Sequence, residues 1–183
     1  AFIDAAKINA PVVVGHSLGG WAAALLAMRH PDRLGKLVLV DAAGYGDEPG
    51  QLIRDYLSQY DPATAVLAER MLAGMTPEQQ RAAQALVASY LAGRTQRPDG
   101  YAMGSLAQSL MRGEDLLGAD LKDIKAPTLI IWGRNDPVVP LTAGESIEKA
   151  IRGARRLVLD GCGHRPQSQC TAAFLSALRE FLN

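Results

Sequence analysis

The sequence predicts an α/β fold: a mostly parallel sheet flanked by helices, with a helical insertion in its middle. Three observations lead to this class: four short apolar runs, amphipathic segments between them, and a long central stretch with no strand signal. The chain has 183 residues, of which 48% are hydrophobic and 21% are charged. This size and composition suit one globular domain, or one domain that carries an insertion.

The four apolar runs are expected to be the strands of the sheet. They are continuously apolar rather than alternating, as strands of a parallel sheet covered on both faces must be. They read PVVVG (11–15), KLVLVD (36–41), PTLIIWG (127–133) and RRLVLD (155–160). Helices are expected between and after them, over residues 18–30, 141–151 and 171–182. This alternation predicts a doubly wound sheet.

The stretch from 50 to 120 interrupts that alternation and is expected to be helical. Asp61-Pro62 and the TPEQ segment at 76–79 are both typical of helix starts, with proline at the first helical position. We therefore divide the chain into a first core part (1–49), a helical insertion (50–120) and a second core part (121–183). An insertion at this point would cover the carboxyl ends of the strands, where open α/β sheets bind ligands.

Charge and hydropathy exclude several classes of protein. Nineteen basic and nineteen acidic residues give a formal net charge of zero, so no electrostatic attraction to nucleic acid or anionic membrane is expected. The apolar runs are far shorter than the roughly 18 residues of a membrane span. The start AFIDAAKINA lacks the pattern of a signal peptide. The two cysteines, Cys162 and Cys170, fit a reducing compartment better than a local disulfide. We therefore expect a cytoplasmic protein.

The segment GHSLGG, directly after the first apolar run, contains the pattern G-x-S-x-G at residues 15–19. A serine at a sharp turn from strand to helix sits in strained backbone, and neighbouring side chains must be small for the turn to close. This role falls to Gly15, His16 and Gly19 around Ser17. The hydroxyl of Ser17 would stand beside a helix N-terminus, and the N–H of Leu18 would form half of an oxyanion hole.

A serine nucleophile needs a base and an acid to orient that base. His164, in DGCGHRP, follows the last predicted strand, whereas His16 is expected to point away from Ser17 if the strand alternation continues. Asp136, in WGRNDPVVP, follows the third predicted strand. Two other carboxylates end strands and compete for the role of acid. These are Asp41, and Asp160, which is disfavoured because it is so close to His164 in sequence.

These three segments, GHSLGG, PTLIIWGRNDPVVP and LDGCGH, resemble the α/β-hydrolase family in its own chain order. The resemblance extends over essentially the whole chain. It implies that Ser17 is the nucleophile, Asp136 the acid and His164 the base, and that the insertion at 50–120 is a cap. Downstream of the base the family often shows a Glu and then a Pro, where this chain has Gln169 and Thr171.

The chain also departs from the family before the serine. Members usually carry four further strands ahead of the strand that leads to the serine, and one of their loops supplies the second oxyanion donor. Only about ten residues precede that strand here. We therefore expect a partial sequence of a longer hydrolase, with the strand at 11–15 forming an apolar sheet edge that has unpaired backbone groups.

The resulting functional prediction is a serine hydrolase that acts on a small carboxylic ester through an acyl-enzyme. Carbon–carbon bond hydrolysis, lactonase and cofactor-free haloperoxidase activity are alternatives on the same residues. A non-catalytic receptor or assembly domain with this fold is the alternative from another class. No metal, cofactor, nucleic acid or membrane is expected; the partner is a small-molecule substrate, and the sequence does not predict an oligomeric state.

Overall fold

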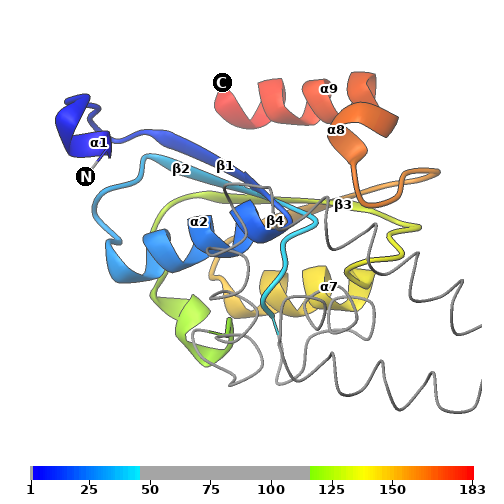
Figure 1. The fold of residues 1–183 in the computed structure, drawn as a ribbon, viewed down its shortest axis with the longest axis horizontal. Coiled ribbons are helices and arrows are strands. Elements are labelled where there is room, and N and C mark those ends of the chain that lie inside the picture. The colour runs from blue at the N-terminus through cyan, green and yellow to red at the C-terminus, as the bar shows by residue number, and fades with distance from the viewer. Residues whose placement is uncertain (1, 46–115) are drawn as a thin grey trace, which may run out of the picture. The chain divides into compact units, whose positions relative to one another are not determined.

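Four parallel strands form the sheet of this protein, in the spatial order β1-β2-β3-β4 (Figure 1). The computed structural model describes residues 2–45 and 116–183. The strands are β1 (Val12–His16), β2 (Lys36–Val40), β3 (Thr128–Gly133) and β4 (Arg155–Leu159). Each lies within one residue of its predicted bounds, and every adjacent pair is parallel. The α/β class and the parallel sheet are therefore confirmed.

Helices cover both faces of the sheet. On one face lie α2 (Leu18–Arg29) and α7 (Leu141–Ala150), and on the other lies α9 (Thr171–Leu182) (Figure 1). These match the three helices that the sequence predicts outside the insertion. The shorter elements are α1 (Phe2–Ala5), η1 (Ala119–Asp123) and α8 (Pro166–Gln169). None of the helices in the described ranges is long and apolar enough to cross a membrane.

The core forms on both sides of the sheet because successive side chains of a strand point to opposite faces. Toward α9, the buried side chains include Val38, Val40, Leu129, Ile131, Phe174 and Phe181. Toward the other face, Trp132 is fully buried, and it packs so closely on α7 that a Cβ at Gly144 would lie 2.6 Å from its ring. Both faces of the central strands are therefore covered, as their continuous apolar runs require.

The register of the sheet brings four chain segments together at its carboxyl edge. His16 pairs with Val40, Val40 with Ile131, and Gly133 with Leu159. The residues that follow these strand ends, Ser17, Asp41, Asn135 and Asp160 among them, therefore emerge along one edge of the sheet.

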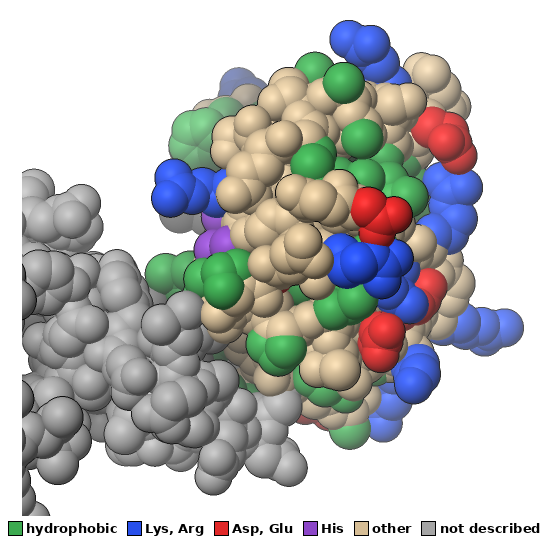
Figure 2. Space-filling view, turned by 90° about the vertical axis from the view of Figure 1, so that its right-hand side faces the viewer, with side chains coloured by type: hydrophobic (Ala, Val, Ile, Leu, Met, Phe, Trp, Pro, Cys, Tyr) green, Lys and Arg blue, Asp and Glu red, His purple; other side chains and the backbone are tan. Residues whose placement is uncertain are grey.

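The strand β1 is an edge strand in the described part of the chain, as predicted: its neighbour there is β2 alone. Val12 and Val14 on it are 44% and 49% exposed, respectively. On the face shown in Figure 2, acidic and basic side chains lie next to one another rather than in patches of one sign. Nearly all of the predicted helical insertion at 50–120 lies outside the described residues, so the domain division stays a prediction.

Candidate active site

Ser17 occupies the sharp turn between β1 and α2 in a strained backbone conformation. Its φ is 54° and its ψ is −120°, a region that residues with a side chain rarely adopt. Hydrogen bonds hold the residue there. Its N–H donates to the carbonyl of Val40 at 2.9 Å, and its carbonyl accepts from the amides of Gly20 and Ala43 at 2.9 and 3.0 Å. The strain is therefore fixed by bonds to both β2 and the segment that follows it.

Two glycines near Ser17 lie where neighbouring segments of the chain approach too closely to leave room for a Cβ atom. A Cβ on Gly15 would overlap the carbonyl of Gly19, and one on Gly20 would lie 2.6 Å from the Cβ of Ala42. At Gly19 itself, no described atom lies within 4 Å of the place a Cβ would take. The sequence analysis emphasised Gly15 and Gly19. The close approaches instead involve Gly15 and Gly20, a residue that the pattern does not include.

The imidazole of His164 lies between Ser17 and Asp136. Its Nε2 is 2.9 Å from the Oγ of Ser17, and its Nδ1 is 2.8 Å from Oδ2 of Asp136. Because a carboxylate can only accept, Nδ1 carries the proton, and Nε2 is free to accept the serine proton. The structure thus brings together the three residues that the sequence selected, although they are separated by up to 147 positions.

Asp136 is held rigidly for its contact with His164. Its side chain is 0% exposed, whereas that of His164 is 18% exposed. Oδ1 of Asp136 accepts hydrogen bonds from the amides of Val138 and Val139 at 2.7 and 3.1 Å. With one oxygen bound by backbone, the carboxylate presents the other oxygen to the imidazole. This arrangement fixes both the tautomer and the orientation of the ring.

The two competing carboxylates are engaged elsewhere. Asp41 is fully buried at the end of β2, where its Oδ1 accepts the amide of Gly133 at 2.8 Å. Burial raises the pKa of Asp41 to about 7, against the effect of that hydrogen bond. Its Oδ2 has no hydrogen-bond partner among the described residues. Asp160 is exposed and forms an ion pair with Arg134. Asp136 is therefore the carboxylate that holds His164.

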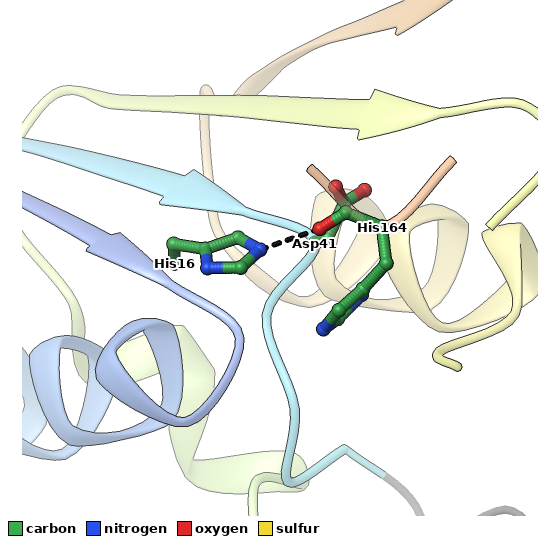
Figure 3. A group of neighbouring side chains, drawn as sticks. All are labelled: His16, Asp41 and His164. Carbon is green, nitrogen blue, oxygen red and sulfur yellow. Dashed lines mark hydrogen bonds between the residues drawn. The ribbon is translucent and has the colours of Figure 1, made fainter. Parts of the chain in front are cut away.

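The expectation that His16 points away from Ser17 gives no sign of the contact that its ring makes with the segment carrying His164. The Nε2 of His16 lies 2.6 Å from the carbonyl oxygen of His164, and the two rings are 4.9 Å apart at a tilt of 49° (Figure 3). The expectation relied on regular strand alternation continuing past His16. The positive φ of Ser17 ends that alternation, so the directions of His16 and Ser17 are set independently.

The segment that carries His164 is closed by a disulfide between Cys162 and Cys170, with a Cα–Cα distance of 6.1 Å. The sequence analysis favoured free thiols, so the structure adopts the alternative it had disfavoured. Gln169 spans the same segment: its Oε1 accepts the amides of Gly163 and Arg165 at 2.9 and 3.2 Å. At position 169 the resemblance to the family implies only a departure from its usual Glu, and residue spacing does not predict these contacts.

The N–H of Leu18 is available for an oxyanion. Leu18 is the first residue of α2, so its N–H has no acceptor within the helix. It lies next to Ser17 at the positive end of the helix dipole, where negative charge is stabilised. This supports its predicted role as a donor.

His16, Asp41 and His164 form the only cluster of three or more potential metal ligands among the described residues (Figure 3). Their donor atoms lie within 4.8 Å of one another. However, both ring nitrogens of His164 bind Ser17 and Asp136, and Nε2 of His16 binds a carbonyl. A metal ion would have to displace these hydrogen bonds. The cluster is therefore better described as a hydrogen-bonded network.

A parallel sheet with helices on both faces, and a Ser–His–Asp arrangement at its carboxyl edge, define the class of α/β hydrolases. The family model described as "alpha/beta hydrolase fold" matches residues 1–169, and this chain belongs to that family.

Curated relatives share the sequence over nearly the whole chain. The 2-hydroxy-6-oxononadienedioate/2-hydroxy-6-oxononatrienedioate hydrolases of Paraburkholderia phymatum and Escherichia coli K12 are each 30% identical to it over 187 residues. These matches cover 98% of this chain but 65% and 64% of the relatives. The chain thus spans slightly less than two thirds of their length.

Solved structures agree on the fold. A meta-cleavage product hydrolase from Pseudomonas fluorescens IP01 is 26% identical, with a TM-score of 0.66 over 100% of this chain and 68% of that one. A 2-hydroxy-6-oxo-6-phenylhexa-2,4-dienoate hydrolase from a Rhodococcus strain reaches a TM-score of 0.69 over 98% of this chain and 66% of its own, at 23% identity.

Proposed function

We propose that this protein is a serine hydrolase in which Ser17 is the nucleophile, His164 the general base and Asp136 the acid that orients it. The observation that carries the proposal is the continuous chain of hydrogen bonds from the Oγ of Ser17, through both ring nitrogens of His164, to the carboxylate of Asp136. A structural serine or histidine needs no such chain, and the strained φ of Ser17 has no other evident purpose.

The chemistry follows from the positions of these atoms. Nε2 of His164 removes the proton of Ser17 as Oγ attacks a substrate carbonyl, and Asp136 stabilises the imidazolium that forms. The N–H of Leu18 donates to the developing oxyanion. The imidazolium then protonates the leaving group. Water, deprotonated by the same nitrogen, attacks the acyl group and releases Ser17.

For the substrate, we propose a carbon–carbon bond next to a ketone, in an acid of the 2-hydroxy-6-oxo-dienoate class. The support is the similarity to hydrolases named for such substrates, at 29–30% identity among curated relatives. Ester hydrolysis is the first expectation from sequence, but an esterase structure from Thermogutta terrifontis is 22% identical and supports the fold alone. The leaving group in this reaction is a carbon, which takes the proton from His164.

A fluorophosphonate probe tests the catalytic assignment without knowledge of the substrate. We expect labelling of the protein at Ser17, complete loss in Ser17→Ala, and a strong decrease in His164→Ala. Labelling that persists at the same rate in Ser17→Ala would refute the assignment.

The substrate class is tested with two compounds on the same preparation. We expect the protein to hydrolyse 2-hydroxy-6-oxonona-2,4-dienedioate, and the loss of the dienolate absorbance measures this reaction. The kcat/KM for this compound should be at least tenfold above the kcat/KM for a p-nitrophenyl ester. Faster turnover of the ester would overturn the carbon–carbon assignment and restore ester hydrolysis, while leaving the role of Ser17 intact.

A further inference from the structure

His16 touches the segment that carries the proposed base, yet it takes no part in the proton path. Its Nε2 contacts the carbonyl oxygen of His164 at 2.6 Å, whereas the imidazole of His164 is bonded to Ser17 and Asp136. His16 ends β1 and directly precedes Ser17, so one short segment of the chain holds both the nucleophile and a contact to the base.

The contact requires that Nε2 of His16 donates a hydrogen bond. A carbonyl oxygen only accepts, so Nε2 of His16 must carry a proton. Burial lowers the pKa of His16 below its usual 6.5, which favours the neutral ring. The other charged groups that act on this ring are Asp136 and Arg165, with opposite effects, and His164 itself. Asp41 lies beside the pair (Figure 3).

We propose that His16 is a positioning residue for His164. It anchors the backbone carbonyl of His164, so that the imidazole stays at hydrogen-bonding distance from Ser17 and Asp136 at once. This inference rests on the proposed function, because it assigns His16 an effect on the base of that reaction.

The geometry explains why an anchor matters at this point. The segment between β4 and α8 leaves the sheet before it reaches His164, and the amides on either side of His164 are held by a single acceptor, Gln169. The carbonyl of His164 is held from the opposite part of the site, by β1. Misplacement of a general base by about 1 Å can lower a rate on the order of a hundredfold.

Two variants separate the hydrogen bond from the bulk of the side chain. His16→Gln keeps an N–H donor at a similar reach, whereas His16→Leu fills the space without a donor. His30→Gln, at the carboxyl end of α2, is the matched control for loss of a histidine outside the site. The first readout is the rate of fluorophosphonate labelling of Ser17 across pH 5–9. The second is the ¹H NMR resonance of the proton shared by Nδ1 of His164 and Asp136.

We expect His16→Leu to lower the labelling rate roughly ten- to a hundredfold. The pH profile should move to lower pH, because a looser contact with Asp136 stabilises the imidazolium less, and the shared-proton resonance should shift or broaden. His16→Gln and His30→Gln should stay close to the unchanged protein in all three respects.

Two results would overturn the proposal. One is a His16→Leu variant with an unchanged rate, pH profile and resonance; the other is a His16→Gln variant as impaired as His16→Leu, which would assign the effect to ring packing. Failure of the proposed function would be recognised by a different result, namely labelling that persists in Ser17→Ala. The resonance is measured without turnover and therefore reports on the anchor in either case.

Discussion

Gly133 packs directly against Gly163, so that the end of β3 and the segment carrying His164 touch through their backbones. A Cβ on Gly133 would overlap the carbonyl oxygen of Gly163 and lie 2.8 Å from that of Cys162. The amide of Asn135 donates to that same Cys162 carbonyl at 2.9 Å. The segments that carry the proposed acid and base are thus joined by backbone contacts.

Substitution of Gly133 by alanine should therefore separate His164 from Ser17. Because the new methyl group meets backbone rather than a mobile side chain, the segment around Gly163 must shift. We expect Gly133→Ala to lower fluorophosphonate labelling of Ser17 at least tenfold. Gly118→Ala is the control, since no described atom lies within 4 Å of a Cβ at Gly118. Equal rates for the two variants would show that the contact is not needed for the site.

Asparagine at positions 136 and 41 distinguishes the two candidate acids. Asp136→Asn leaves an amide facing Nδ1 of His164 and favours the wrong tautomer of the imidazole, so kcat should fall by about 10³–10⁴-fold. Asp41→Asn keeps an oxygen for the amide of Gly133 and should lower kcat less than tenfold. Steady-state kinetics on one substrate measure both effects. The reverse order would make Asp41 the acid.

The parts of the site that the sequence predicts are those fixed by strand ends. In a parallel sheet every carboxyl end lies at the same edge, so Ser17, Asp136 and His164 could be brought together from strand positions alone. The contacts of His16, Gly133 and Gln169 could not be predicted in this way. These contacts depend on the backbone direction at the positive φ of Ser17 and on the path of the segment that follows β4. The periodicity of apolar residues predicts neither of these features.

The buried carboxyl of Asp41 should make stability depend on pH. Its pKa is raised from 3.8 to about 7 by burial, so the folded protein retains the proton that the unfolded chain releases. The Asp41 carboxyl therefore lowers the free energy of unfolding progressively as the pH rises from about 4 to 7. Above that range its effect on the free energy of unfolding is constant. Asp41→Asn lacks this effect, and asparagine tolerates the φ of 42° at this position.

Thermal unfolding of the two proteins at pH 5 and pH 8 measures this effect. We expect the Tm of Asp41→Asn, relative to the unchanged protein, to be higher at pH 8 than at pH 5. A difference in Tm that is the same at both pH values would show that the Asp41 carboxyl has an ordinary pKa.

The disulfide between Cys162 and Cys170 should stabilise the folded chain. It closes a loop with a sequence separation of 8, and such a short loop corresponds to about 2.5 kcal/mol of unfolding free energy. Alkylation in denaturant without a reductant, followed by mass spectrometry, should leave both cysteines unmodified. Chemical denaturation with and without a reductant measures the stabilisation. Alkylation of both thiols would establish the free cysteines that the sequence analysis favoured.

Gln169 provides the acceptor for the amides on both sides of His164, and its substitution should loosen the base without altering the residues in the proton path. Gln169→Leu removes the acceptor and leaves its partners, the amides of Gly163 and Arg165, to water. We expect kcat to fall roughly tenfold with little change in KM, because the lost contact orders the base rather than the substrate. Gln169→Glu retains an oxygen at the same reach and should restore most of the rate. If Gln169→Glu is as slow as Gln169→Leu, the amide group itself matters rather than its oxygen; if neither variant is slowed, His16 and the disulfide are sufficient to hold His164 in place.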